Sequence, residues 1–191
     1  MRYAKEHKDR TRQRIVDTAA RRFREQGIEG EGVKSLMSAA GLTNGAFYNH
    51  FASKEDLARE AVTAAMRERV DRLRYWFASG EGLAGMIRSY FSVGHRDRPG
   101  AGCAVAIFSA EMVRHTDEVR AAYTEGVREF IAIAATHWAS LSPEDALSRA
   151  TALYGLMAGT MQIARATQDD VFSKAVLESG MHAALAMIEI D

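Results

Sequence analysis

Cysteine, proline and strand-like patterns are scarce in this chain of 191 residues. The one cysteine, Cys103, excludes any disulfide within the chain and fits a reducing compartment. Only Pro99 and Pro143 occur, and no segment shows the apolar–polar alternation that predicts a strand. Apolar runs end well short of the roughly 18–20 residues of a membrane span, and the N-terminus is charged. We therefore expect an all-α, cytoplasmic protein without a membrane span.

The formal net charge is zero, but the two parts of the chain differ in sign. Residues 1–54 contain 11 Lys and Arg against 6 Asp and Glu, whereas residues 55–191 contain 14 against 19. Such asymmetry is typical of a protein in which one segment binds a polyanion and the other segment does not. Chance clustering of basic residues is the alternative that charge alone leaves open. We predict two domains with these bounds, 1–54 and 55–191.

The apolar spacing in the basic part of the chain predicts helices. Ile15, Ala19 and Phe23 recur every four residues, which predicts a helix over 8–26 that Gly27 ends. The preceding residues 2–10 are expected to form a loose basic arm that can follow a phosphate backbone.

Two more helices are predicted after Gly27, over 33–40 and from Thr43 to Phe51, separated by a turn at Gly41. Phe47 and Phe51 lie four residues apart and face the core, and Thr43 is expected to cap this helix. A helix, a short turn with glycine and a second helix predict a helix-turn-helix, whose second helix enters the major groove.

The remainder predicts a longer helical body. Ser53, with Asp56 three residues later, predicts the capped start of a helix over 54–78 that joins the two parts. Ser142 and Pro143 predict another capped start. Further helices are expected at about 83–94, 103–115, 117–139, 143–167 and 170–188.

The chain resembles the TetR family of bacterial one-component transcription regulators. The resemblance lies in three segments, Ala39–Thr43, Gly45–Phe51 and Ser53–Leu57, and in Phe23 and Gly27. The resemblance covers the first quarter to third of the chain. It implies a three-helix DNA-binding head, a helical ligand-binding body and a homodimer. Such a dimer represses transcription from palindromic double-stranded DNA until a small-molecule inducer, here expected to be apolar or amphipathic, binds. No cofactor and no enzymatic activity are expected.

The resemblance also suggests roles for individual residues. Thr43, Asn44 and Gly45 are expected near base edges. Tyr48, His50 and Lys54 are expected at backbone phosphates, with Asn49 on the same polar face. The alternative is a solvated helix face. The chain departs from the family pattern at Glu31-Gly32, where relatives commonly place Ser or Thr before the second helix, so we assign no DNA contact there.

Aromatic and methionine side chains of the body are candidates for the wall of an apolar ligand pocket, because they adapt to hydrophobic ligands. Plain core packing is the alternative for each of them. The predicted pocket residues are Phe77, Tyr90, Cys103, Phe108, Met112, Trp138, Met157 and Met161.

The last two helices are candidates for the contact between two subunits, since Gly155 and Gly159 permit a close approach of backbones. Packing within one subunit is the alternative. The predicted interface residues are Leu153, Tyr154, Met157, Met161, Phe172, Val176, Ala183 and Met187.

Three other functions are considered for the chain. Cys103 lies near His95 in sequence and could sense electrophiles or oxidants, although a free cysteine more often fills space in a core. A cysteine-dependent enzyme would need His95 or His115 as a base. An architectural protein that coats DNA is disfavoured by the acidic body. His95, Asp97, Glu111 and His115 lack metal-ligand spacing, so no metal site is predicted.

Overall fold

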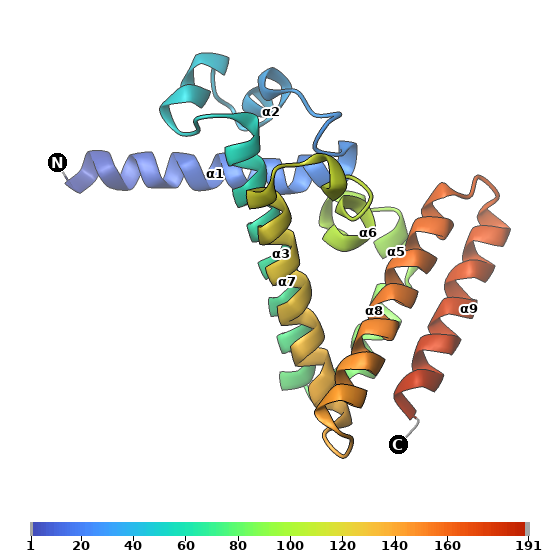
Figure 1. Ribbon diagram of the computed structural model, residues 1–191. Helices are drawn as coiled ribbons and strands as arrows, with labels where there is room; N and C mark the ends of the chain where they lie inside the picture. Colours follow the sequence, from blue (N-terminus) through green and yellow to red (C-terminus); the bar gives the residue numbers. More distant parts are fainter. Residues whose placement is uncertain (1, 190–191) are drawn as a thin grey trace.

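The structure is a computed structural model that describes residues 2–189, with side chains from residue 6 onward. Every regular element in this part of the chain is a helix, which confirms the all-α class (Figure 1). The elements are α1 (Arg2–Gln26), α2 (Val33–Ala39), the 3₁₀ helix η1 (Asn44–Asn49), α3 (Lys54–Ala78), α4 (Gly82–Tyr90), α5 (Val93–Arg96), η2 (Pro99–Ala101), α6 (Ala104–Phe108), η3 (Met112–Arg114), α7 (Asp117–Ala135), η4 (Thr136–Trp138), α8 (Pro143–Ala166) and α9 (Asp170–Glu189).

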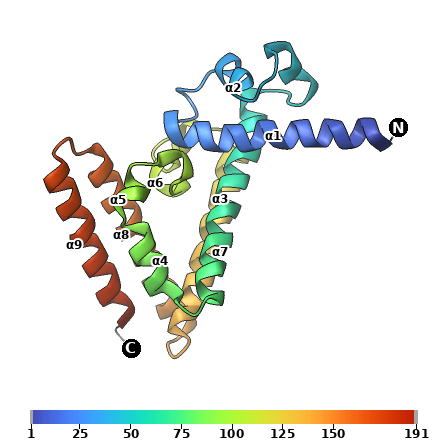
Figure 2. The ribbon, with the colours of Figure 1, turned by 180° about the vertical axis from the view of Figure 1, so that it is seen from behind.

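The helices form a small head and a larger body. In the head, α1 crosses the first part of α3, with α2 and η1 on the far side of α1 from the body (Figures 1 and 2). In the body, α7 runs alongside α3, and α8 and α9 form an antiparallel pair. Because α3 continues from the head into the body, it links the two rigidly. The domain division at residues 54 and 55 falls in its first turn and stays a prediction.

The expected loose arm at residues 2–10 is wrong, because α1 is helical from Arg2. No glycine or proline interrupts this stretch, and Ala4, Lys5 and Glu6 all have high helix propensity. The basic N-terminal residues therefore project from the head on a helix (Figure 1).

Two body helices are shorter than the sequence predicts. The helix expected at 83–94 ends at Tyr90, and the Ser92 hydroxyl caps the separate α5 by accepting the His95 N–H at 3.2 Å. The helix expected at 103–115 divides into α6 and η3. Between these two, Glu111 accepts the backbone N–H of Ile28 at 2.8 Å, so the break places a body carboxylate against the head.

The helix over 54–78 is confirmed, with the predicted cap. Ser53 accepts the Asp56 N–H at 3.1 Å, and the Asp56 carboxylate accepts the Ala52 N–H at 3.2 Å. The predicted cap at Thr43 is wrong, because its side chain makes no capping bond and the following segment is a 3₁₀ helix. Gly41, with φ of 69°, makes the turn before it.

By length and composition alone, α9 could span a bilayer, and it is the one such helix in residues 2–189. Apolar helices of other proteins pass the same test, and α9 packs along α8. Only 22% of its most apolar stretch is buried, so much apolar surface stays uncovered by its own chain.

Candidate nucleic-acid interface and body cavity

The polar face of η1 is open to solvent. Phe47, at 1% exposure, anchors the segment to the core, while its neighbour Tyr48 is 72% exposed. The other exposed residues predicted to contact DNA are Thr43, Asn44, Gly45 and Asn49. The structure thus places five of the seven predicted DNA-binding residues on one exposed segment.

The remaining two, His50 and Lys54, are half-buried beside that segment. Burial, with Lys8 and Arg12 adding to it, lowers the pKa of His50, so its imidazole is neutral at neutral pH. Its Nδ1 is buried without a hydrogen-bond partner among the described residues. Lys54 Nζ donates to the Glu29 carbonyl at 3.3 Å. Both side chains can donate to a phosphate, but only Lys54 brings a charge.

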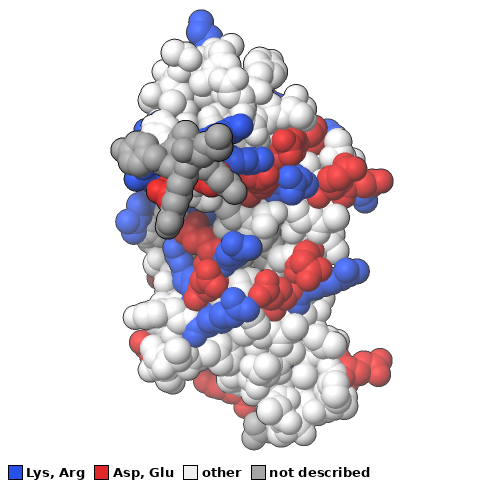
Figure 3. Space-filling model, turned by 90° about the vertical axis from the view of Figure 1, so that its left-hand side faces the viewer, with Lys and Arg blue, Asp and Glu red and all other residues white. Residues whose placement is uncertain are grey.

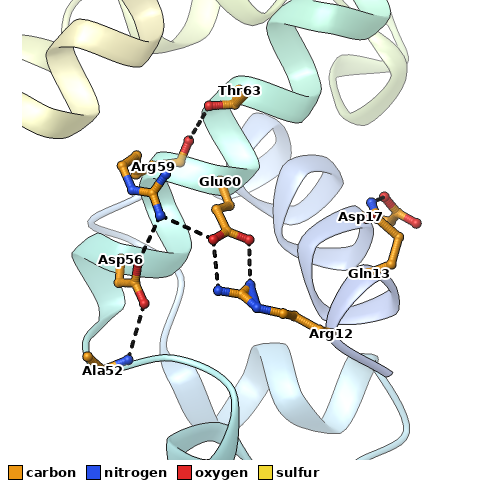
Figure 4. A network of polar contacts seen from close by, with 8 residues as sticks. All are labelled: Arg12, Gln13, Asp17, Ala52, Asp56, Arg59, Glu60 and Thr63. Atoms are coloured by element: carbon orange, nitrogen blue, oxygen red, sulfur yellow. Dashed lines mark hydrogen bonds and ion pairs between the residues drawn. The ribbon is translucent and has the colours of Figure 1, made fainter. Parts of the chain in front are cut away.

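A network of polar contacts connects α1 with the start of α3 and with Ala52, just after η1 (Figure 4). The Phe47 and Phe51 rings lie 5.6 Å apart beneath η1, and the Arg12 guanidinium covers Phe51 at 4.2 Å from the ring centroid. Arg12 also holds Glu60 of α3 through both of its terminal nitrogens. Arg59 then bridges Glu60 and Asp56 at 3.1 Å each. The arginine of α1 therefore serves the scaffold of the head.

Charge on the face seen in Figure 3 is mixed over the central band and sparse at the top, where α2 and η1 lie. A duplex approaching η1 meets polar and aromatic groups first, and charged groups of both signs lie below them. Glu31, before α2, is 2% exposed and accepts from Arg22 at 2.8 Å, and Gly32 caps α2 without a side-chain bond. This explains how the head accommodates its departure from the family pattern.

A cavity of about 240 Å³ lies in the body between α3 and α4, bounded by the segment that carries α5 and η2. Arg24 of α1 also reaches its wall. Arg24 donates to the Gly100 carbonyl at 2.8 Å and to Glu68 at 2.9 Å, so the head helix is tied to the rim. The lining residues are Arg24, Ala65, Glu68, Arg69, Arg72, Trp76, Met86, Ser89, Tyr90, Ser92, Gly94, His95, Arg98, Ala101, Gly102 and Cys103.

The cavity includes two of the eight predicted pocket residues, Tyr90 and Cys103. The other six, Phe77, Phe108, Met112, Trp138, Met157 and Met161, do not line it. Five of these six are buried in the core, and Phe77 is half-buried against it. Sequence reasoning missed the arginines of the wall, because it sought apolar residues and treated basic ones as surface.

Arg69 of α3 is the most unusual residue of the cavity. It is 9% exposed, and its guanidinium carbon lies 4.8 Å from the Tyr90 ring centroid and 4.7 Å from that of Phe130. Its Nε and Nη2 have no hydrogen-bond partner among the described residues. A buried cation is thus compensated by aromatic faces.

His95 fixes one wall of the cavity in its neutral form. Its Nε2 accepts the backbone N–H of Cys103 at 3.0 Å, so Nδ1 carries the proton and donates to the Tyr90 carbonyl at 2.6 Å. Burial is the main cause that lowers its pKa to about 4; the bond to Tyr90 opposes this and the charge of Arg165 adds to it. Protonation of Nε2 would break the hydrogen bond that it accepts from the Cys103 N–H.

The pKa of His95 predicts how stability depends on pH. Above pH 6.5 the imidazole is neutral in both states; between 6.5 and about 4 only the unfolded chain takes up the proton, so stability falls with falling pH. The loss ascribed to His95 should reach roughly 2–3 kcal/mol near pH 4. Urea unfolding at several pH values should show that His95→Gln loses less stability than the wild type as the pH falls. The prediction would be contradicted if stability depended on pH equally in both proteins.

Cys103 and the histidines do not assemble into a catalytic pair. Cys103 is 2% exposed, and the His95 nitrogen that would act as the base already accepts its backbone N–H. His115 lies apart at the junction of head and body, where its Nδ1 is 3.0 Å from Glu55. The burial of the thiol favours the space-filling role over that of a sensor.

Potential metal-ligating atoms meet at one place in the described residues. Glu29, Glu55 and His115 each offer an atom within 4.8 Å of the others. The Glu55–His115 hydrogen bond accounts for the proximity of those two residues, and we assign no ion to the group. Of the four residues considered from the sequence, only His115 belongs to this group.

The predicted interface residues divide into two sets. Leu153, Tyr154, Met157 and Met161 are at most 5% exposed, and Tyr154 stacks on Phe130. Their own chain covers these four, which leaves them little surface for a subunit contact. Phe172 is 57% exposed, Ala183 is exposed, and Val176 and Met187 are half-buried, so these four remain accessible.

Comparisons with known proteins match this architecture. Residues 15–61 match the model of the bacterial regulatory proteins of the tetR family. The chain is 29% identical over 104 residues to the HTH-type transcriptional repressor KstR2 of Rhodococcus jostii, and 31% over 124 residues to the HTH-type transcriptional repressor DhaR of Mycobacterium sp.. These matches span 54% and 62% of this chain but only 50% and 59% of the relatives.

A solved structure extends the likeness to the body. The crystal structure of reduced Escherichia coli NemR superposes with a TM-score of 0.74 at 25% identity, covering 91% of this chain and 94% of that one. The predicted helix-turn-helix head and helical body therefore agree with the family model, the sequence relatives and this structure. Residues 15–61 of this chain therefore belong to the TetR family of bacterial regulatory proteins, and the chain as a whole shares the fold of reduced NemR.

Proposed function

We propose that the protein is a cytoplasmic homodimeric repressor that binds palindromic double-stranded DNA through η1 and is released by a small molecule in the body cavity. DNA binding is supported by the exposed polar face of η1, which lies above the buried Phe47 and Phe51. Asn44 and Tyr48 are the side chains we expect to reach a base edge and a phosphate.

DNA binding is tested with a duplex selected from random sequence by the full-length protein. In a mobility-shift assay the selected duplex should bind more than about 100-fold more tightly than a shuffled duplex of equal length and composition. Equal competition by the shuffled duplex would instead support the architectural alternative.

Dimerisation is supported by an uncovered ridge on α8. Leu147, Thr151, Gly155, Gly159 and Ile163 recur every four residues, and four of them are exposed. Leu147 is 45% and Ile163 is 56% exposed, and a methyl group at either glycine would meet no atom within 4 Å. Glycines between apolar residues permit close helix approach, so we assign this ridge, with the accessible residues of α9, to the subunit contact.

We expect Ile163→Glu to convert the dimer to a monomer, because it buries an unpaired carboxylate in each half of the contact. Light scattering after size exclusion should report a mass near 21.1 kDa, in place of twice that value. Val113→Glu is the matched control, since Val113 is 76% exposed on η3 and does not belong to this ridge. An Ile163→Glu dimer of unchanged affinity would refute the assignment.

Release by a ligand is supported by contacts between the cavity, the body and α1. Arg24 belongs to the cavity wall and to α1, and its two hydrogen bonds would change if a ligand drew its guanidinium inward. Gly27, at the end of α1, has φ of 78° and lies against Glu111, which holds Ile28. A ligand that favours another position of Arg24 would thereby change the spacing of the two heads. Release requires different affinities for the two arrangements.

A further inference from the structure

Two residues of the cavity wall, Arg69 and Tyr90, have buried polar atoms without a hydrogen-bond partner among the described residues. In Arg69 these atoms are Nε and Nη2, which lie on the same edge of the planar guanidinium. Two parallel N–H groups on one edge match the two oxygens of a carboxylate or a phosphate. A charge buried without a counter-ion is costly, and the nearby rings of Tyr90 and Phe130 compensate it only in part.

The charges of the cavity wall are strongly unbalanced. Four arginines line it, Arg24, Arg69, Arg72 and Arg98, against one carboxylate, Glu68. Arg24 and Arg72 share Glu68 at 2.9 and 3.2 Å, whereas no ion pair within the described residues includes Arg69 or Arg98. The neutral His95 does not change this balance. The cavity therefore attracts anions.

A second unused donor lies beside Arg69. The Tyr90 hydroxyl is buried without a hydrogen-bond partner, and Tyr90 lines the cavity. Burial raises the pKa of Tyr90 well above its ordinary value, so the hydroxyl keeps its proton and can donate to an anion.

The rest of the wall suits a small apolar body. Ala65, Trp76 and Met86 line the same space of about 240 Å³. An apolar cavity of about 150 Å³ holds benzene, so this one has room for an aromatic ring or a short alkyl chain with its acidic group. A bare inorganic anion would leave the apolar wall without contact.

We propose that this cavity binds a small organic acid, whose carboxylate pairs with the Arg69 guanidinium and whose apolar body lies against Trp76 and Met86. The Tyr90 hydroxyl completes the carboxylate site. This assignment narrows the expected apolar or amphipathic inducer to an anionic one. This assignment rests on the proposed function only for the role of the acid as inducer, because the test measures binding of the acid in the absence of DNA.

The test compares acids with their neutral amides on the full-length protein. Benzoate, phenylacetate and hexanoate, and the three corresponding amides, are added at about 10 mM and constant ionic strength, and the melting temperature is measured. At least one acid should raise it by about 3–6 °C more than its amide. In Arg69→Met this difference should vanish, while the melting temperature without ligand is unchanged or higher, because an unpaired buried charge is removed.

Two further variants keep the test decisive. Arg67→Met, on the exposed side of the same helix, should keep the full acid effect. If Arg69→Met does not fold, Tyr90→Phe should reduce the acid effect by removing only the hydroxyl.

Several results would overturn the assignment. One is that no acid exceeds its amide by about 1 °C, and another is that the acid effect persists in both the Arg69→Met and the Tyr90→Phe protein. Equal stabilisation by inorganic phosphate would rule out an organic acid in favour of a bare anion. The mobility-shift assay on the protein without acid separates this failure from a failure of the proposed function. If the protein binds the selected duplex but no acid, only the assignment of the cavity fails.

Discussion

Tyr48→Ala should weaken binding of the selected duplex by about 10- to 100-fold while the melting temperature stays the same. Tyr48 is 72% exposed, so its removal costs the fold little, and surface substitutions typically change stability by less than about 0.5 kcal/mol. In a homodimer each half-site loses one contact. A loss of about 1 kcal/mol at each half-site therefore adds up to a large change in affinity.

The chain offers a closely matched control for this experiment. Tyr75 is 65% exposed near the body end of α3, far from η1, and Tyr75→Ala should leave DNA binding within about twofold of the wild type. Equal loss in both variants would point to a general effect of removing an exposed ring. Unchanged binding by Tyr48→Ala would remove Tyr48 from the DNA interface.

Phe47→Ala should destabilise the protein by about 3–5 kcal/mol and also abolish DNA binding. Phe47 is 1% exposed and packs on Phe51, so truncation removes buried apolar area and leaves a cavity. Domains of this size are stable by only about 5–15 kcal/mol, so the loss is a large fraction of the total. η1, a 3₁₀ helix of six residues, has no other deeply buried anchor within its bounds.

Urea unfolding measures this loss, and a conservative variant separates packing from chemistry. Phe47→Leu keeps most of the apolar volume and should recover most of the stability and of the DNA affinity. A loss below about 1 kcal/mol for Phe47→Ala would show that η1 is held by something other than this ring. Adjacent residues thus have different expected phenotypes: Phe47→Ala loses both stability and DNA binding, whereas Tyr48→Ala loses only DNA affinity.

The head could be predicted from the sequence because its signals are local. Caps, glycine turns and four-residue apolar spacing depend on residues close together in the chain, so Ser53, Gly41 and the pair Phe47 and Phe51 were sufficient. The errors in the head are also local. The helical start at Arg2 follows from a stretch of high helix propensity without glycine or proline, and the 3₁₀ form of η1 differs from the predicted helix only in its local hydrogen-bond pattern.

The body was less predictable, because a helical pattern does not say which side a residue faces in a many-helix core. Met157 and Met161 are equally apolar whether they line a pocket, meet a second subunit or fill the core, and the structure places both in the core. The expected 103–115 helix divides at a contact between Glu111 and Ile28, which are 83 residues apart in the sequence.

The sequence by itself determined the all-helical class, the helix-turn-helix, the basic first part and the polar face of η1, because each follows from composition or short-range spacing. Only the tertiary structure decided the character of the cavity. Arg24, Arg69 and Arg98 are far apart or unremarkable in sequence, and the crossing of α1 with the body brings them around one space beside Tyr90. Burial of a guanidinium among aromatic rings is a property of packing, and it turns an expected apolar pocket into a site suited to an anion.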